Sequence, residues 1–137
     1  MSRVINPDSV GKERNQLVKS VVVALRVLMS QEKADEHTYD LAAYIVLALR
    51  KIADSIDLSV VAWEKRGYWV KADRFRIEWM WTGEMSEAMR NALYQNDLGS
   101  IASNSAKIAS KLHGVKVPVN HRMGTPWVGA WDLLQSK

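Results

Sequence analysis

The sequence has 137 residues, of which 47% are hydrophobic and 25% are charged, with a formal net charge of +4. A chain of this length fits one domain that buries roughly two thirds of the surface exposed when it is unfolded. The absence of cysteine excludes disulfides, thiolate zinc sites and thiol nucleophiles. The first apolar run is broken by Lys19 and Arg26, so it lacks the uninterrupted hydrophobic region of a signal peptide, and it is too short to span a membrane. We therefore expect a soluble, cytoplasmic protein.

The positive charge is unevenly distributed along the chain. Residues 1–62 carry eight basic and eight acidic side chains, and residues 63–97 carry six of each. The excess lies in residues 98–137, which contain five basic side chains and one acidic side chain, Asp132. If the protein binds nucleic acid, the phosphate contacts are expected from the basic side chains of this last segment, which are Lys107, Lys111, Lys116 and Arg122.

The N-terminal segment is predicted to be a helix. Asn6 is a suitable cap and Pro7 a suitable first residue. The run from Val21 to Val27 is rich in β-branched residues and is also compatible with a strand, but the helical periodicity on both sides of it favours a helix. The apolar residues at helical spacing are Val10, Leu17, Val21, Ala24, Leu25 and Leu28.

A second helix is predicted from about Asp35 to Arg66, with an apolar stripe of Leu41, Ile45, Ala48, Leu49, Ile52, Ile56, Val60 and Trp63. Gly67 supplies the usual left-handed stop after it. Residues 67–70 offer no Ser, Thr, Asp or Asn cap for a following helix, so a bent continuous helix through Gly67 is the alternative.

A third helix is predicted from about Trp69 to Gln95, and a fourth follows Asp97 as its cap and ends at Gly114. Residues predicted to face inward are Ala72, Phe75, Trp79, Met85, Met89 and Leu93 on the third helix, and Leu98, Ile101, Ala102, Ile108, Ala109 and Leu112 on the fourth.

Residues 114–137 differ in composition from the rest of the chain. Pro118 and Gly124 predict an irregular path, and Thr125 with Pro126 is predicted to open a short helix. On this short helix one apolar face, which needs a cover, is formed by Trp127, Trp131 and Leu134.

The predicted fold is all-α, an antiparallel four-helix bundle of about residues 7–113 with a C-terminal arm, 114–137, that ends in a short helix. The first two helices also carry apolar residues on the expected solvent side, namely Val22, Val23, Val27, Leu47, Leu58 and Val61. Either the arm or a second copy of the chain covers them. We favour a homodimer formed through Val23, Leu47, Leu58 and Val61.

Residues 63–81 contain four tryptophans and five basic residues. Such a mixture is typical of single-stranded nucleic-acid grooves and also of helices with a heavy core face. At 100° per residue Tyr68, Phe75 and Trp79 fall together, which favours core packing for the rings. Trp81 falls on a flank beside Arg74 and Glu78, where side chains are expected to be half-exposed.

Lys71 and Arg74 occupy the first turns of the third helix, where the helix dipole disfavours positive charge. One hypothesis compensates them by ion pairs along the helix, with Glu78, Glu64 and Asp73 available nearby. The other places a bound anion there. The ligand candidates of this flank are Arg66, Lys71, Arg74, Glu78 and Trp81.

His121 and Arg122, which precede the turn at Thr125, are a second anion-binding candidate or loop residues that tie the arm to the bundle. No catalytic residue, metal or cofactor is predicted, since the HExxH, GxSxG and phosphate-binding glycine motifs are missing, as is the Glu-x-x-His pattern of di-iron bundles. The acidic pairs Asp54/Asp57 and Glu84/Glu87 are expected on solvated faces.

The opening INPDSVGKERNQLVKS and the closing KVPVNHRMGTPWVGAWDLL resemble a small bacterial family of uncharacterised all-helical proteins. The resemblance covers most of the chain and implies one intact domain, and it transfers no activity. We expect a non-enzymatic interaction or scaffold protein that self-associates. The alternatives are a small basic subunit of a nucleic-acid complex and a binder of small anionic ligands.

Overall fold

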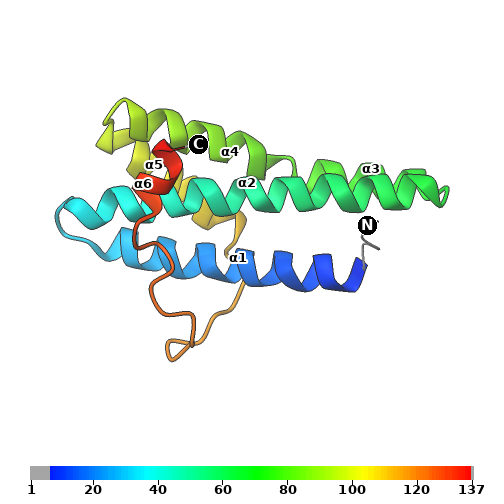
Figure 1. Ribbon diagram of the computed structural model, residues 1–137, viewed down its shortest axis with the longest axis horizontal. Coiled ribbons are helices and arrows are strands. Elements are labelled where there is room, and N and C mark those ends of the chain that lie inside the picture. Colours follow the sequence, from blue (N-terminus) through cyan, green and yellow to red (C-terminus); the bar gives the residue numbers. More distant parts are fainter. Residues whose placement is uncertain (1–6, 137) are drawn as a thin grey trace.

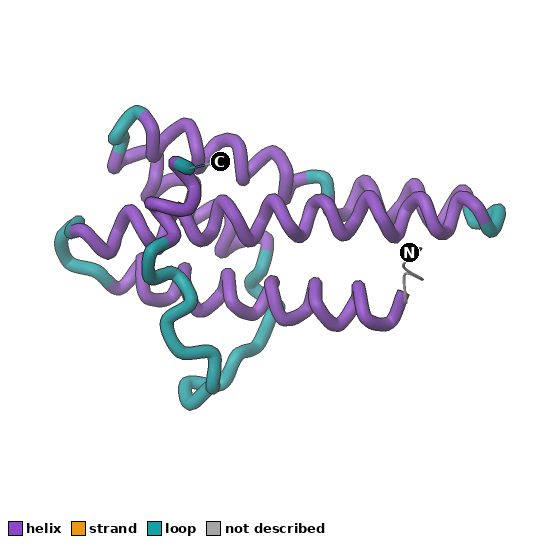
Figure 2. Tube along the Cα trace, viewed as in Figure 1, coloured by secondary structure: helices purple, strands orange, loops and turns teal. Residues whose placement is uncertain are grey.

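The computed structural model describes residues 7–136, and within that range it contains helices and no strand (Figures 1 and 2). This confirms the all-α prediction. The predicted cap Asn6 lies outside the described residues. The helices are α1 (Pro7–Ser30), α2 (Glu36–Lys65), α3 (Trp69–Trp79), α4 (Trp81–Tyr94), α5 (Leu98–Lys111) and α6 (Ala130–Gln135).

The long helix α2 begins and ends where local chemistry dictates. Asp35 and Thr38 form a capping box, in which each side chain accepts a backbone N–H of the other. At the other end Gly67 has φ +80°, and the N–H of Tyr68 bonds to the carbonyl of Trp63 at 2.9 Å. The chain therefore reverses at Gly67, and α2 and α3 are separate helices.

Four helices close a ring around the core in one part of the molecule. α1 packs on α2, α2 on α4, α4 on α5, and α5 on α1. Ser86 on α4 donates to the carbonyl of Val46 on α2 at 2.9 Å, so even a buried hydroxyl is paired. We call α4, α5, residues 17–30 of α1 and residues 36–53 of α2 the closed part. Its fully buried side chains include Leu41, Ile45, Leu49, Met89 and Ile108.

The prediction of one helix over residues 69–95 was wrong, because the helix breaks at Met80. The hydroxyl of Thr82 donates to the carbonyl of Trp79 at 2.7 Å, a bond that competes with the helical ladder. Just beyond the break α4 approaches α2 closely, since a Cβ placed on Gly83 would lie 3.8 Å from that of Ala53. The break lets α4 take its own angle on α2.

The antiparallel pair α4 and α5 is matched in length, at 14 residues each. Asp97 caps α5 by accepting bonds from the Ser100 hydroxyl and N–H at 2.7 and 3.0 Å, which lower the pKa of Asp97. After α5 the chain turns away from the bundle. α3 is therefore left packed mainly on α2, and Figure 1 shows α3 and the end of α2 projecting beyond α4 and α5. We call α3, residues 54–65 of α2 and residues 9–16 of α1 the open part.

The arm returns along α1 and places α6 on α2. Arg26 donates to the carbonyl of Val117 at 3.0 Å, and the Asp40 carboxylate accepts the N–H groups of Gly129 and Trp131 at 3.2 and 2.9 Å. Asp40 thus caps α6 from a distant helix, where no residue of the arm does so.

The predicted start of the short helix at Thr125 was wrong. The chain makes turns after Pro126, and helix begins at Ala130, after Gly129 with φ +82°. The expected cover for its apolar face is confirmed, because Trp127 and Leu134 are buried and α6 packs on α2.

Two residues of the predicted dimer surface lie inside the chain. Val23 is 2% exposed and Leu47 is 9% exposed. Leu47 faces Pro126 and Ala130 of the arm across a cavity of about 350 Å³. Both residues are therefore removed from any self-association surface, whereas Leu58 and Val61 remain exposed.

No helix between residues 7 and 136 combines the length and apolar character that crossing a bilayer requires.

Candidate functional site

Two aromatic rings form the floor of a groove in the open part. Trp63 of α2 and Phe75 of α3 meet edge to face, with ring centroids 4.8 Å apart. The Lys71 ammonium lies 4.5 Å from the centre of the Trp63 ring, and the Arg14 guanidinium lies 4.9 Å from that of Phe75. Each ring therefore already carries a cation of the protein on its face.

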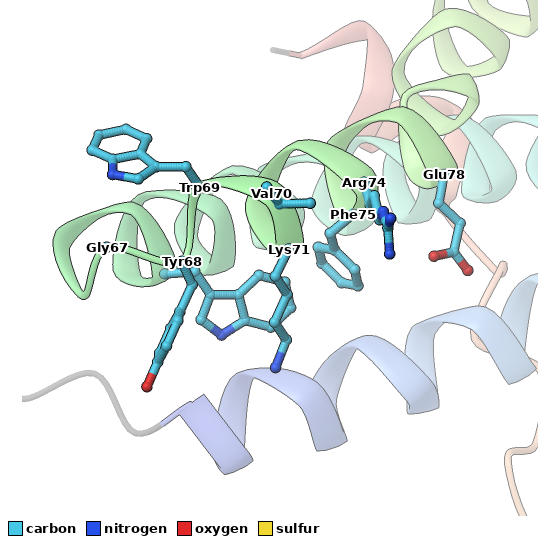
Figure 3. Close-up of a pocket in the computed structure, with 9 residues that line it drawn as sticks. Gly67, Tyr68, Trp69, Val70, Lys71, Arg74, Phe75 and Glu78 are labelled. Carbon is cyan, nitrogen blue, oxygen red and sulfur yellow. The ribbon is translucent and has the colours of Figure 1, made fainter.

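Helical spacing on α3 builds one wall of this groove. Lys71, Arg74, Phe75 and Glu78 follow the i, i+3, i+4, i+7 pattern and so share one side of the helix. Figure 3 shows these side chains projecting toward α1, whereas Trp69 projects away from it. The groove has a volume of about 720 Å³ and is lined by Trp63, Gly67, Tyr68, Trp69, Val70, Lys71, Arg74, Phe75 and Glu78.

Arg14 holds α1 against α2 beside the groove. It donates to the hydroxyls of Ser55 and Ser59 at 2.9 and 2.6 Å and to the carbonyl of Ser55 at 3.1 Å. Burial lowers its pKa. None of the ion pairs among the described residues includes Arg14, so hydroxyls and a ring face are its counterparts.

Arg14 was not predicted from the sequence as a site residue. It interrupts the apolar stripe of α1, four residues after Val10 and three before Leu17, and a single cation at such a position was the signal available.

Two acidic residues that lie near Lys71 and Arg74 in the sequence form ion pairs with a different cation. Glu64 and Asp73 both pair with Arg76, at 3.1 and 2.9 Å. Neither Lys71 nor Arg74 takes part in an ion pair among the described residues, and Glu78 lines the groove without one. The predicted compensation of Lys71 and Arg74 by ion pairs, with Glu78 as the main partner and Glu64 and Asp73 nearby, was therefore wrong.

The groove consequently has an excess of positive charge. Three cations, Arg14, Lys71 and Arg74, surround its floor, and Glu78 is the one carboxylate among its lining residues. Residues 63–97 are neutral as a segment, but Glu64 and Asp73 pair with Arg76 and so do not offset Lys71 and Arg74. This surface is suited to a partner that is apolar in the middle and negative at its edges.

Other members of the predicted site lie apart from the groove. Trp81 stacks on Trp79, with centroids 6.3 Å apart and planes at 23°, and packs against the core. Arg66 is the exposed C-cap of α2 and is not among the lining residues. The predicted flank of Arg74, Glu78 and Trp81 is thus divided between groove and core.

The prediction of inward-facing rings holds for part of the stretch. Phe75 and Trp79 pack against the core, but Tyr68 is 55% exposed and Trp69 is 64% exposed. Tyr68 departs from the helical wheel because it is the N-cap of α3, with φ −89° and ψ 59°, and does not share the helical geometry. The structure therefore gives the aromatic stretch an inner and an outer set.

The second predicted anion site lies in the arm, on the side of α1 and the start of α2. His121 accepts the N–H of Met123 on Nδ1 at 3.2 Å, which fixes a local turn, and Arg122 is exposed. The structure does not bring either residue to Lys71 or Arg74, because the arm docks on the closed part.

The predicted phosphate contacts are spread over two elements. Lys107 and Lys111 are one turn apart on an exposed face of α5, and Lys116 and Arg122 are exposed on the arm. α5 contains no aromatic residue, so its basic face offers no surface for base stacking.

Among the described side chains, no group of three or more His, Cys, Asp or Glu is placed to hold a metal ion. In comparisons with known proteins, the chain matches no family model, no curated protein and no solved structure. The functional inference therefore depends on the geometry of the groove and of the exposed apolar surface.

Proposed function

We propose that this protein is a helical interaction module that self-associates through the open part, with Leu58 and Val61 of α2 at the centre of the contact. The observation that carries the proposal is where large apolar side chains are exposed. Among the described residues, seven of the thirteen such side chains fall between residues 58 and 80: Leu58, Val61, Tyr68, Trp69, Val70, Ile77 and Met80. Tyr68, Trp69 and Val70 line the groove, whereas Leu58 and Val61 lie outside it on α2. Apolar surface concentrated in this way is typical of interaction sites.

The face of α2 that holds Leu58 and Val61 is covered elsewhere along the same helix. Leu58 follows Leu47 by eleven residues, close to three helical turns, so the two side chains lie on one face. The arm covers that face at Leu47, whereas Leu58 and Val61 are each 47% exposed. A second copy of the chain supplies the missing cover for the rest of the face.

A twofold arrangement suits this surface, because each subunit contributes the same two side chains to the contact. Burying the exposed half of each Leu or Val contributes roughly 1 kcal/mol. Lys51, Asp54 and Lys65 flank the patch in exposed positions and supply a rim of both signs. The expected dimer is therefore of low affinity.

Sedimentation velocity over a range of protein concentrations tests the proposal. The four side chains together contribute roughly 4 kcal/mol, so we expect the unaltered chain to dimerise at concentrations approaching about 1 mM. The double variant Leu58→Glu, Val61→Glu should remain monomeric, because four buried carboxylates would oppose association. The matched control is Val119→Glu, Val128→Glu, which changes two exposed valines of the arm and should leave the dimer intact. A monomeric unaltered chain, or equal loss of dimer in both variants, would contradict self-association through α2.

A further inference from the structure

The open part lacks the fourth helix that the closed part has. In the closed part α5 lies beside both α4 and α1 and completes the ring. α5 is as long as α4, at 14 residues, and the chain leaves the bundle at Gly114, so no helix within residues 7–136 pairs with the 11 residues of α3 in the same way. The position that a longer α5 would occupy lies between α3 and α1, on the side of the groove.

We propose that this groove binds an amphipathic helix of a partner protein, with acidic residues beside its apolar face, in the position that α5 leaves open. The inference goes beyond self-association, because the groove lies on another side of α2. Trp63 in the groove floor follows Leu58 by five residues, which places the two side chains about 140° apart around the helix.

The floor of the groove fits the apolar stripe of a short helix. Trp63 and Phe75 provide ring edges, and Tyr68 extends the surface at the turn end. The wall formed by α3 is 11 residues long, about 16 Å, which matches three turns of a docked helix. Such a helix presents apolar residues at i, i+3, i+4 and i+7, the usual anchors of helix-in-groove recognition.

The charges around the groove floor determine which residues should flank the apolar face of the docked helix. Lys71 and Arg74 lie on the α3 wall without a carboxylate partner among the described residues. Arg14 is partly desolvated, and its partners are two hydroxyls, a carbonyl and the Phe75 ring, none of them a carboxylate. Carboxylates on the docked helix would pair with Lys71 and Arg74 at the rim, where complementary charge sets specificity and association rate. A basic helix would bring like charges together and is disfavoured.

The ring faces argue against a nucleic acid in the same place. Base stacking needs open π-faces, and the Lys71 ammonium and the Arg14 guanidinium already cover faces of Trp63 and Phe75. Exposed ring edges and the alkyl part of Lys71 remain, and these suit leucine and isoleucine side chains. An acidic helical peptide is therefore the ligand class that both the shape and the charges support.

Fluorescence anisotropy with designed peptides tests the inference. The probe is a dye-labelled peptide of about 15 residues with leucine at i, i+3, i+4 and i+7 and glutamate at the flanking positions. Its counterparts carry lysine in place of glutamate, or the same residues in scrambled order. We expect the glutamate peptide to bind at least about tenfold more tightly than the lysine peptide, with the preference decreasing at high salt.

Charge reversal locates the binding site. The double variant Lys71→Glu, Arg74→Glu changes two exposed residues of the groove. It should bind the glutamate peptide about tenfold more weakly, and the lysine peptide more tightly, than the unaltered chain does. The matched control Lys107→Glu, Lys111→Glu makes the same change of net charge on α5 and should leave both affinities unchanged. A gain for the lysine peptide is a result that partial unfolding cannot produce.

Each other outcome overturns the inference. No binding of the glutamate peptide up to about 1 mM means that the groove does not take a helix. Equal binding of the scrambled peptide removes the helical requirement, and equal binding of the lysine peptide removes the acidic one. If citrate or a mononucleotide raises the melting temperature of the unaltered chain but not of Lys71→Glu, Arg74→Glu, while no peptide binds, the groove is a small-anion site. Sedimentation velocity measures self-association separately from peptide binding, so either proposal can be contradicted without the other.

Discussion

The closed and open parts share α2 and differ in what surrounds it. In the closed part α1, α4 and the arm pack on the helix, and Leu47 is 9% exposed beneath the arm. In the open part, eleven residues further on along the same face of the helix, Leu58 is 47% exposed. The difference shows that apolar content alone does not identify a core residue, because the elements available to cover a position decide whether it is buried.

Polar groups are paired internally in both parts, and the two parts differ in the cations beside the groove. In the closed part, Tyr44 donates to Ser20 at 2.7 Å, Ser86 bonds to α2, and the Asp40 carboxylate is satisfied by the arm. In the open part Lys71 and Arg74 have no carboxylate partner among the described residues. The open part also has internal pairs, of Arg76 with two carboxylates and of Arg14 with two serine hydroxyls. The contrast therefore rests on Lys71 and Arg74, which are left to pair with something else.

A matched pair of substitutions on α2 tests this comparison with the largest expected effect. Leu49→Ala should lower the free energy of unfolding by about 3 kcal/mol, because it leaves a cavity in a closed core. Leu58→Ala should cost less than about 1 kcal/mol, since half of that side chain is already in water. Urea unfolding followed by tryptophan fluorescence measures both.

The protein concentration in these unfolding experiments should lie below the dissociation constant of the proposed dimer, so that association does not add to the apparent stability. Equal losses for the two variants would mean that Leu58 is packed in solution, and the division into closed and open parts would then fail.

Local signals in the sequence predicted the ends of several helices. Asp97 caps α5, and Gly67 ends α2 with a positive φ, as expected from residue types that act within one turn. The apolar stripe of α2 likewise predicted its buried side from Leu41 to Val60. These features depend on neighbours in sequence, so a single sequence contains them.

Features that depend on distant segments were not predicted. Asp40 caps α6 by accepting the N–H of Trp131, which is 91 positions away in the sequence, and no local pattern predicts this bond. Leu47 was assigned to a dimer surface because the path of the arm over it is not encoded nearby. The groove likewise exists because α5 stops level with the break at Met80, a relation between two helix lengths that emerges in the assembled bundle.

The attachment of the arm gives the next effect in size. Asp40→Ala removes the cap of α6 and should lower the free energy of unfolding by about 1 kcal/mol, while Asp40→Asn, which keeps one acceptor oxygen, should cost less. Asp57→Ala, an exposed acid on the same helix, is the control and should have little effect. Amide exchange at Trp131 should speed up in Asp40→Ala alone. Unchanged exchange there would show that Trp127 and Leu134 hold α6 in place without Asp40.

The smallest expected effect concerns the side of α1 in the open part. A Cβ placed on Gly11 would meet no atom within 4 Å, and the residue is inside a helix, where alanine is favoured over glycine by about 1 kcal/mol. Gly11→Ala should therefore raise the melting temperature by a few degrees. Gly67→Ala provides the opposite control, because φ +80° strains any residue with a Cβ. If Gly11→Ala were destabilising, the space beside α1 would be filled in solution, and the open part would be less open than its helices indicate.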